Sequence, residues 1–272
     1  MMVNNNFFLK WIASVLLLIF FFTACGKDKL HFAEPKMVKV EGGTFTMGCS
    51  DEEWCSDESL PQHTVTLSSF KISKYPVTQK QWEAVMGLTI SQQRDKSSPH
   101  CPLYGEGDNY PVYYVSWDDA QEFIAKLNAA TDKNYRLPTE AEWEFAARGG
   151  NKSKGYRFSG SNNVNDVAWT RCNSDKYTHP VGTKLPNELG IYDMCGNVTE
   201  WCNDWYGEEY YACSPPTNPL GPDSGSRRVL RNNGALDDCG FIYISCCFNV
   251  AFRYSFEPYV RNPDIGFRLV LP

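Results

Sequence analysis

The chain has 272 residues, of which 42% are hydrophobic and 21% are charged, and its formal net charge is −6. This composition is typical of a globular protein and excludes a disordered chain. The acidic balance and the lack of phosphate-loop, dinucleotide-binding and histidine-rich motifs disfavour nucleic acid as a partner and most cofactor enzymes as a class.

The first 25 residues have the pattern of an export signal. Lys10 precedes an apolar run over 11–24, which is shorter than the roughly 20 residues that cross a bilayer. A small residue before Cys25 is similar to the lipobox of bacterial lipoproteins. We therefore predict a lipoprotein signal peptide over 1–25, lipidation at Cys25, and a bacterial cell-envelope protein anchored to the outer membrane. The alternatives are an uncleaved anchor and an ordinary signal peptide.

Residues 26–36 are predicted to form a polar tether, and 37–272 a single domain without a visible internal linker. Of the 11 cysteines, ten remain after Cys25, and an even number in an oxidising compartment permits disulfides. Cys49 and Cys55 are the one local pair that we favour.

Two stretches near the start of this domain predict strands, at 37–48 and 63–72. In the second stretch, Val65 and Leu67 share one face because apolar and polar residues alternate. Short strands are therefore expected before the first helix.

Three capped helices are expected next. Thr78 with Gln81, and Thr139 with Glu142, have the spacing of capping boxes, and Ser116 is the third predicted N-cap. After residue 150 the helical periodicity ends, and a chain rich in Asn, Gly, Pro and aromatic residues follows. That part should be irregular and held by side-chain hydrogen bonds, disulfides or metal ions.

Seven segments of the chain carry recognisable motifs: 40–48, 75–79, 114–120, 135–148, 187–206, 228–231 and 262–268. In this order they resemble the sulfatase-modifying-factor family, also known as the formylglycine-generating-enzyme family. The resemblance implies an α+β, C-type-lectin-like fold with much irregular structure and with calcium as a stabilising ion.

One calcium site of the family falls on the 187–206 segment. The resemblance implies side-chain ligands at Asp193 and Glu200 and backbone carbonyl ligands at Gly196 and Val198. Calcium prefers such oxygen ligands. The alternative is that the two acids are solvated on the surface.

Four charged residues near the third helix permit two interpretations. Arg136, Glu140, Glu142 and Arg148 could serve acid–base chemistry, but charged residues around a capped helix more often form structural ion pairs. We therefore predict structural ion pairs.

The family's enzymes bind copper(I) through two cysteines and oxidise a substrate cysteine to formylglycine. Cys239 and Cys246 are the candidate catalytic pair here, but six residues separate them, whereas the family motif has four. Asn232, Asn233 and Gly234 stand in place of the family's Gly-Gly-Ser. The resemblance therefore does not transfer the oxidase activity to this chain, and copper is expected only under the oxidase alternative.

The segment 232–256 contains no Lys, Gln, Glu, Met or Trp. This pattern resembles the variable region of retroelement-diversified proteins, which have a C-type-lectin-like fold and an exposed binding face. The alternative is a buried hydrophobic strand. The candidate ligand-binding residues are Phe241, Tyr243, Phe248, Phe252, Tyr254, Phe256 and Tyr259.

The expected function is non-catalytic ligand binding or adhesion through the loop face 232–261, with an unknown protein or glycan as the partner. A copper-dependent formylglycine-generating oxidase is the first alternative. A structural scaffold of an envelope machine is the second.

Overall fold

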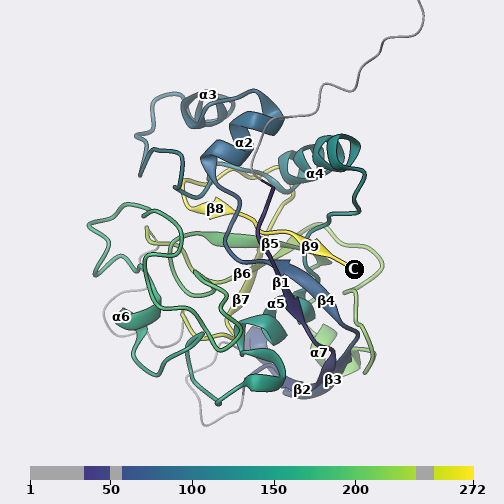
Figure 1. Ribbon diagram of the computed structural model, residues 1–272. Helices are drawn as coiled ribbons and strands as arrows, with labels where there is room; N and C mark the ends of the chain where they lie inside the picture. The colour runs from purple at the N-terminus through teal and green to yellow at the C-terminus, as the bar shows by residue number, and fades with distance from the viewer. Residues whose placement is uncertain (1–33, 50–56, 237–247) are drawn as a thin grey trace, which may run out of the picture. The chain divides into compact units, whose positions relative to one another are not determined.

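The structure is a computed structural model that describes residues 34–49, 57–236 and 248–272. Within these residues, the strands near the start of the domain form two small antiparallel sheets (Figure 1). On β3, Val65 and Leu67 are buried and the threonines beside them are exposed, which confirms the predicted alternation. One sheet has the order β1-β4-β9, formed by β1 (Met37–Val40), β4 (Phe70–Ser73) and β9 (Val270–Leu271), and the other pairs β2 (Gly43–Met47) with β3 (His63–Leu67).

The three predicted helices begin at their predicted N-caps, Thr78, Ser116 and Thr139. In each case the cap side chain accepts a hydrogen bond from the third helical N–H, and the third side chain accepts one from the cap N–H. A further capping box, at Thr89 and Gln92, begins a helix that we did not predict. The helices are α2 (Gln79–Met86), α3 (Ile90–Asp95), α4 (Trp117–Thr131), α5 (Glu140–Ala147), α6 (Val164–Val167) and α7 (Tyr210–Cys213), with short 3-10 turns η1 (Asp57–Ser59) and η2 (Gly150–Lys152).

A four-stranded sheet with the order β7-β6-β5-β8 positions the candidate sites. Its strands are β5 (Thr199–Trp205), β6 (Arg228–Arg231), β7 (Arg253–Phe256) and β8 (Ile265–Gly266), with only the β5–β8 pairing parallel. Successive residues of a strand point to opposite faces. Glu200 accepts a hydrogen bond from Trp143 of α5, whereas Trp201 donates one to the carbonyl of Val115, just before α4. Helices α5 and α4 therefore cover opposite faces of this sheet.

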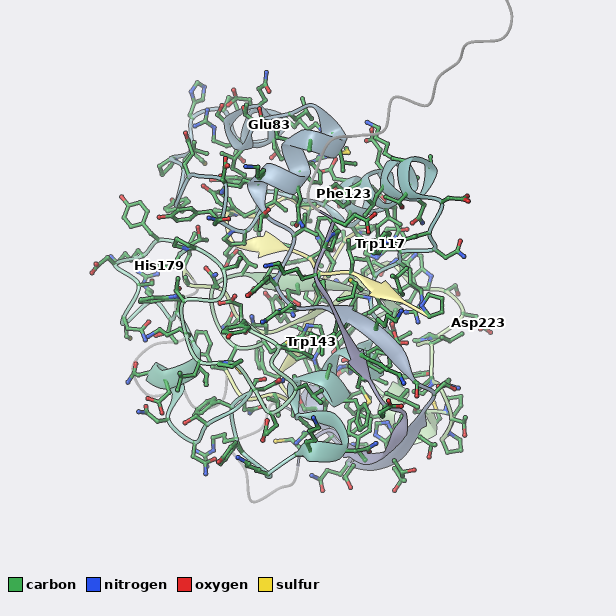
Figure 2. The ribbon with its side chains drawn as sticks, in the orientation of Figure 1. Glu83, Trp117, Phe123, Trp143, His179 and Asp223 are labelled. Atoms are coloured by element: carbon green, nitrogen blue, oxygen red, sulfur yellow. The ribbon has the colours of Figure 1, made fainter. Side chains whose placement is uncertain are left out.

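The hydrophobic core packs around α5, whose eight residues are all buried. Figure 2 shows Trp143 within this core. Because Glu140, Glu142 and Glu144 are buried with the helix, their carboxylates require internal partners.

The chain after η2 is irregular, as predicted, and asparagine side chains hold much of its backbone. Asn187 donates to the carbonyl of Ala146 and accepts hydrogen bonds from the N–H groups of Leu189 and Ile191. Asn197 exchanges two hydrogen bonds with the backbone of His179. Short sheets, capped helices and these fixed loops together confirm the predicted α+β fold class.

The described residues belong to one compact unit, His31–Pro272. Cys49 is disulfide-bonded; its predicted partner Cys55 lies outside the described residues, as do the predicted signal peptide 1–25 and the lipidation site Cys25. Among the helices that the structure describes, none has the length and apolar character to cross a membrane.

Candidate functional sites

Three aromatic rings form a row along β7, from Phe252 just before the strand to Phe256 at its end. The ring centroids of Phe252 and Tyr254 are 5.5 Å apart, and those of Tyr254 and Phe256 are 5.8 Å apart in an edge-to-face arrangement. All three residues are partly exposed. The Tyr254 hydroxyl donates to Oγ1 of Thr199 at 2.9 Å, which fixes the central ring. Phe252, Tyr254 and Phe256 are called the β7 aromatic row below.

The other predicted ligand-binding residues have different surroundings. Tyr259 is 66% exposed. Phe248 is 1% exposed and belongs to the hydrophobic core, so the prediction of an exposed anchor is wrong at this residue. An aromatic side chain suits both a core and a binding face, and the residue types alone do not distinguish these positions. Phe241 and Tyr243 lie outside the described residues.

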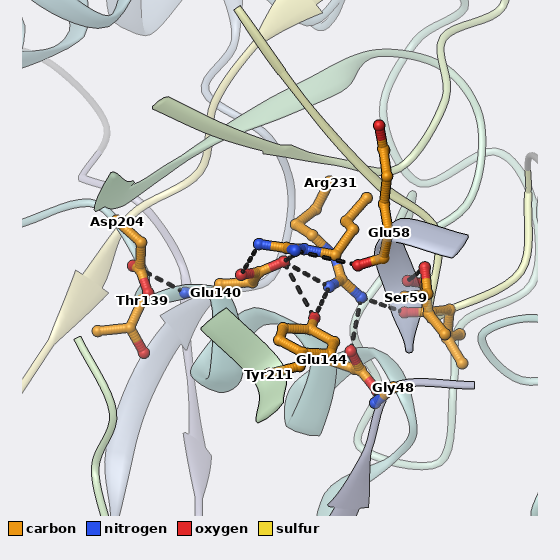
Figure 3. A network of polar contacts seen from close by, with 12 residues as sticks. Gly48, Glu58, Ser59, Thr139, Glu140, Glu144, Asp204, Tyr211 and Arg231 are labelled. Atoms are coloured by element: carbon orange, nitrogen blue, oxygen red, sulfur yellow. Dashed lines mark hydrogen bonds and ion pairs between the residues drawn. The ribbon is translucent and has the colours of Figure 1, made fainter. Parts of the chain in front are cut away.

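On the α5 side of the sheet, buried arginines and glutamates form a network (Figure 3). Arg231 donates to Oε1 of Glu140 at 2.9 Å and to Oε2 of Glu144 at 2.8 Å. Arg253 donates to both oxygens of Glu140, at 2.6 and 3.0 Å. Arg148 donates to Glu144 at 2.8 Å, so each carboxylate has two arginine partners.

The charges of this network compensate one another. Burial raises the pKa of the Glu140 carboxyl, but the positive charges of Arg253 and Arg231 outweigh burial and hold that pKa below its usual value. Glu140 therefore remains ionised. Because its oxygens are engaged by two guanidinium groups, Glu140 is structural, as predicted.

Arg136 and Glu142, two of the four charged residues that were predicted to form structural ion pairs, pair with each other. The guanidinium contacts both carboxylate oxygens, at 2.6 and 2.7 Å, and Glu142 also accepts the N–H of its cap residue Thr139. The two residues line a surface pocket of about 250 Å³. The bidentate contact nevertheless occupies the carboxylate that acid–base chemistry would need.

The predicted calcium region is brought together, with Asp193 and Glu200 buried at 3% and 0% exposure. This burial contradicts the alternative that both acids are solvated. Arg268 donates to both oxygens of Glu200, at 2.6 and 2.7 Å, and Trp143 donates to the same carboxylate at 2.7 Å. Burial raises the pKa of Asp193 to about 6, and its carboxylate accepts the Gly182 N–H at 2.8 Å.

Asn232 completes this region. Its Oδ1 accepts the N–H of Gly196 at 2.6 Å, and its Nδ2 donates to the carbonyls of Gly196 and Val198 at 2.7 and 2.8 Å. Both expected carbonyl ligands thus face a donor nitrogen, and the expected Glu200 carboxylate faces a guanidinium. Among the described residues, no cluster of three or more His, Cys, Asp or Glu side chains could hold a metal ion. This donor arrangement does not fit the calcium ion that the resemblance implies.

The candidate copper pair, Cys239 and Cys246, lies outside the described residues. Within the described part, Cys195 and Cys202 are buried and not disulfide-bonded. Burial raises the pKa of the Cys195 thiol to about 12. A thiol with so high a pKa stays protonated near neutral pH and is a poor nucleophile.

The fold and the irregular, side-chain-fixed loops define a C-type-lectin-like protein with a sulfatase-modifying-factor architecture. The family model described as the sulfatase-modifying factor enzyme 1-like domain matches residues 22–272 of this chain. The chain therefore belongs to the sulfatase-modifying-factor family, as its sequence motifs predict.

Three proteins are similar to this chain over most of its length. The chain is 31% identical to the chaperone protein LppX of Paenibacillus barcinonensis, over 96% of this chain and 98% of that protein. It is 32% identical to the formylglycine-generating enzyme of Streptomyces coelicolor, over 85% and 87% of the two chains. The solved structure of Treponema denticola variable protein 1 matches with a TM-score of 0.75 and 31% identity, over 89% and 96%.

Proposed function

We propose that the protein is an exported, lipid-anchored protein of the bacterial envelope that binds a protein or glycan ligand without catalysis. The β7 aromatic row and Tyr259 form the ligand-contacting face. Cys25 carries the lipid and places the domain at the outer membrane. The end-to-end similarity to LppX, which includes the N-terminal part of this chain, supports a shared domain plan.

The β7 aromatic row is the observation that carries this proposal. Aromatic side chains supply large, rigid contact areas and lose little conformational entropy on binding. The row is partly exposed and its central ring is fixed by Thr199, so part of that entropy is lost on folding rather than on binding. Tyr259 adds a ring that is 66% exposed.

The sequence of the surrounding segment supports binding more than oxidation. Residues 232–256 lack five residue types and have neither the family's Gly-Gly-Ser nor its cysteine spacing. The similarity to a protein named as variable supports diversification of this segment by a retroelement. Diversification of this segment would change which ligand is bound, while the rest of the domain stays constant.

Binding is tested with the full-length processed protein on arrays of glycans and of purified extracellular-matrix proteins. Tyr259→Ser and Phe256→Ser should each weaken a specific interaction by at least about tenfold, because each removes an aromatic contact. Tyr177→Ser is the matched control, since Tyr177 is 51% exposed and belongs to a different loop. Affinity is measured by surface plasmon resonance, and the melting temperature of each variant by calorimetry.

Four results would redirect this conclusion. An equal loss of affinity in Tyr177→Ser would contradict a role for the β7 aromatic row. Formylglycine formation on a Cys-x-Pro-x-Arg peptide by the copper-loaded protein would establish the oxidase instead. An array without a specific ligand would favour the envelope scaffold. Suppression of client aggregation would favour a chaperone, the second candidate function, which the similarity to LppX supports.

A further inference from the structure

The side chain of Asn232 lies in the middle of the region where the family resemblance implies calcium. Asn232 is 2% exposed and has a backbone φ of 69°, a left-handed conformation that glycine adopts most easily and asparagine tolerates. It stands in place of the first glycine of the family's Gly-Gly-Ser. The substitution therefore introduces an amide where the family has no side chain.

The hydrogen-bond partners of this amide determine its orientation. The Gly196 N–H can only donate, so the atom facing it at 2.6 Å must be the carbonyl oxygen of the side chain. The carbonyls of Gly196 and Val198 can only accept, so the atom facing them must be the NH₂ group. A reversed amide would place a donor against a donor and an acceptor against two acceptors.

Arg268, which belongs to the 262–268 segment that matches the family, neutralises the acidic side chain of the turn. Its guanidinium is completely buried, contacts both oxygens of Glu200, and donates to the carbonyls of Tyr192 and Asp193 at 3.0 and 3.3 Å. One positive group thus neutralises the Glu200 carboxylate and engages a backbone oxygen of the same turn.

We propose that the amide of Asn232 replaces the calcium ion at the 193–200 turn, where Arg268 already neutralises Glu200, so that this chain holds the turn without a metal. Calcium needs six to eight oxygen ligands at about 2.3–2.6 Å. Here the amide nitrogen of Asn232 bridges the Gly196 and Val198 carbonyls, where a calcium bound to both oxygens would have to lie. The guanidinium of Arg268 already contacts the carboxylate of Glu200, which is the charged ligand that calcium would use.

The test compares melting temperatures in excess EGTA and in millimolar calcium chloride, together with the calcium content of the dialysed protein. The wild-type chain should melt within about 1 °C in the two buffers and retain no stoichiometric calcium. Asn232→Asp keeps the shape of the side chain but turns an oxygen toward two carbonyls. Its melting temperature should fall by at least about 4 °C in EGTA and rise again with calcium.

A matched control separates this effect from a general effect of added charge. Asn218 also has a positive φ, of 45°, but lies in an exposed loop away from the turn. Asn218→Asp should therefore show no response to calcium. Three results would each overturn the proposal. The first is a wild-type melting temperature that falls clearly in EGTA, and the second is one bound calcium per wild-type chain. The third is an Asn232→Asp variant that melts like the wild type in EGTA.

Discussion

Arg231 lies on β6 with its side chain completely buried between two glutamates of α5. It also donates to the carbonyl of Val250 at 2.6 Å, which connects β6 to the chain just before β7. A buried ion network of this kind stabilises a fold only while every charge keeps its partners. Arg231 is therefore the arginine that Glu140 and Glu144 share, while Arg253 and Arg148 each pair with one of them.

At this scale we predict that Arg231→Met lowers the free energy of unfolding by about 3 kcal/mol, because the buried carboxylates of Glu140 and Glu144 each lose one of their two arginine partners. Arg227→Met is the control. Arg227 is exposed and pairs with Glu257 at 3.4 Å, so its loss should cost less than about 1 kcal/mol. Urea denaturation measures both values, and equal costs would show that the network contributes no more than a surface pair.

Residue-scale contacts were only partly predictable from the sequence. The ion pair of Arg136 with Glu142 joins residues that are close in sequence, one just before the capped helix and one in its first turn. The partners of Glu140, in contrast, are Arg231 and Arg253, which are about a hundred residues away along the chain. No local pattern reports such a pairing, and the same holds for the contacts of Asn232 with the 193–200 turn.

Helix α5 supplies Glu140, Glu142 and Glu144, the carboxylates of the ion pairs around it. Its capping box satisfies two N–H groups, those of Thr139 and Glu142, at a buried helix start where water cannot replace a lost hydrogen bond. The Glu142 carboxylate accepts the N–H of Thr139 and also pairs with Arg136, so the helix cap and this ion pair share one side chain.

We predict that Thr139→Ala lowers the free energy of unfolding by about 1–2 kcal/mol, since it removes the hydroxyl that accepts the Glu142 N–H. Thr139→Ser retains the hydroxyl and should cost less than about half of that. Chemical denaturation of both variants provides the measurement. If Ser and Ala are equally destabilising, the lost methyl group rather than the cap determines stability here.

The elements themselves were more predictable than their contacts. The N-caps at Thr78, Ser116 and Thr139 and the alternation on β3 were correct because these signals act over a few residues. Helix α3 was missed because only its first residue, Ile90, is apolar in a stretch of six. The burial of Phe248 was also missed, because exposure depends on the assembled fold.

Across the whole molecule, the 257–262 segment is held to α4 by a charged contact. Arg261 donates to both oxygens of Asp119, at 2.6 and 2.9 Å. Burial raises the pKa of Asp119, but hydrogen bonds from Arg261 and from the Ser116 N–H, with the charge of Lys96, outweigh burial and lower that pKa to about 2.

This contact predicts a specific acid sensitivity. A carboxylate whose pKa is lower in the folded state contributes stability above its unfolded pKa, near 4, and loses that contribution as the pH falls toward 2. Arg261→Gln should therefore be less stable than the wild type by about 1–2 kcal/mol at pH 6, after allowance for solvent screening of the partly exposed arginine. The difference should shrink toward pH 2 in urea titrations, and a difference that does not change with pH would contradict this origin.

The sheet β1-β4-β9 has a consequence for how the protein is made. Strand β4 pairs with β1, near the start of the domain, and with β9, where Ile72 lies opposite Val270. The second pairing joins residues that are synthesised far apart in time, and it cannot form until β9 has left the ribosome. On the nascent chain, β4 therefore has one edge without its partner strand until β9 has emerged.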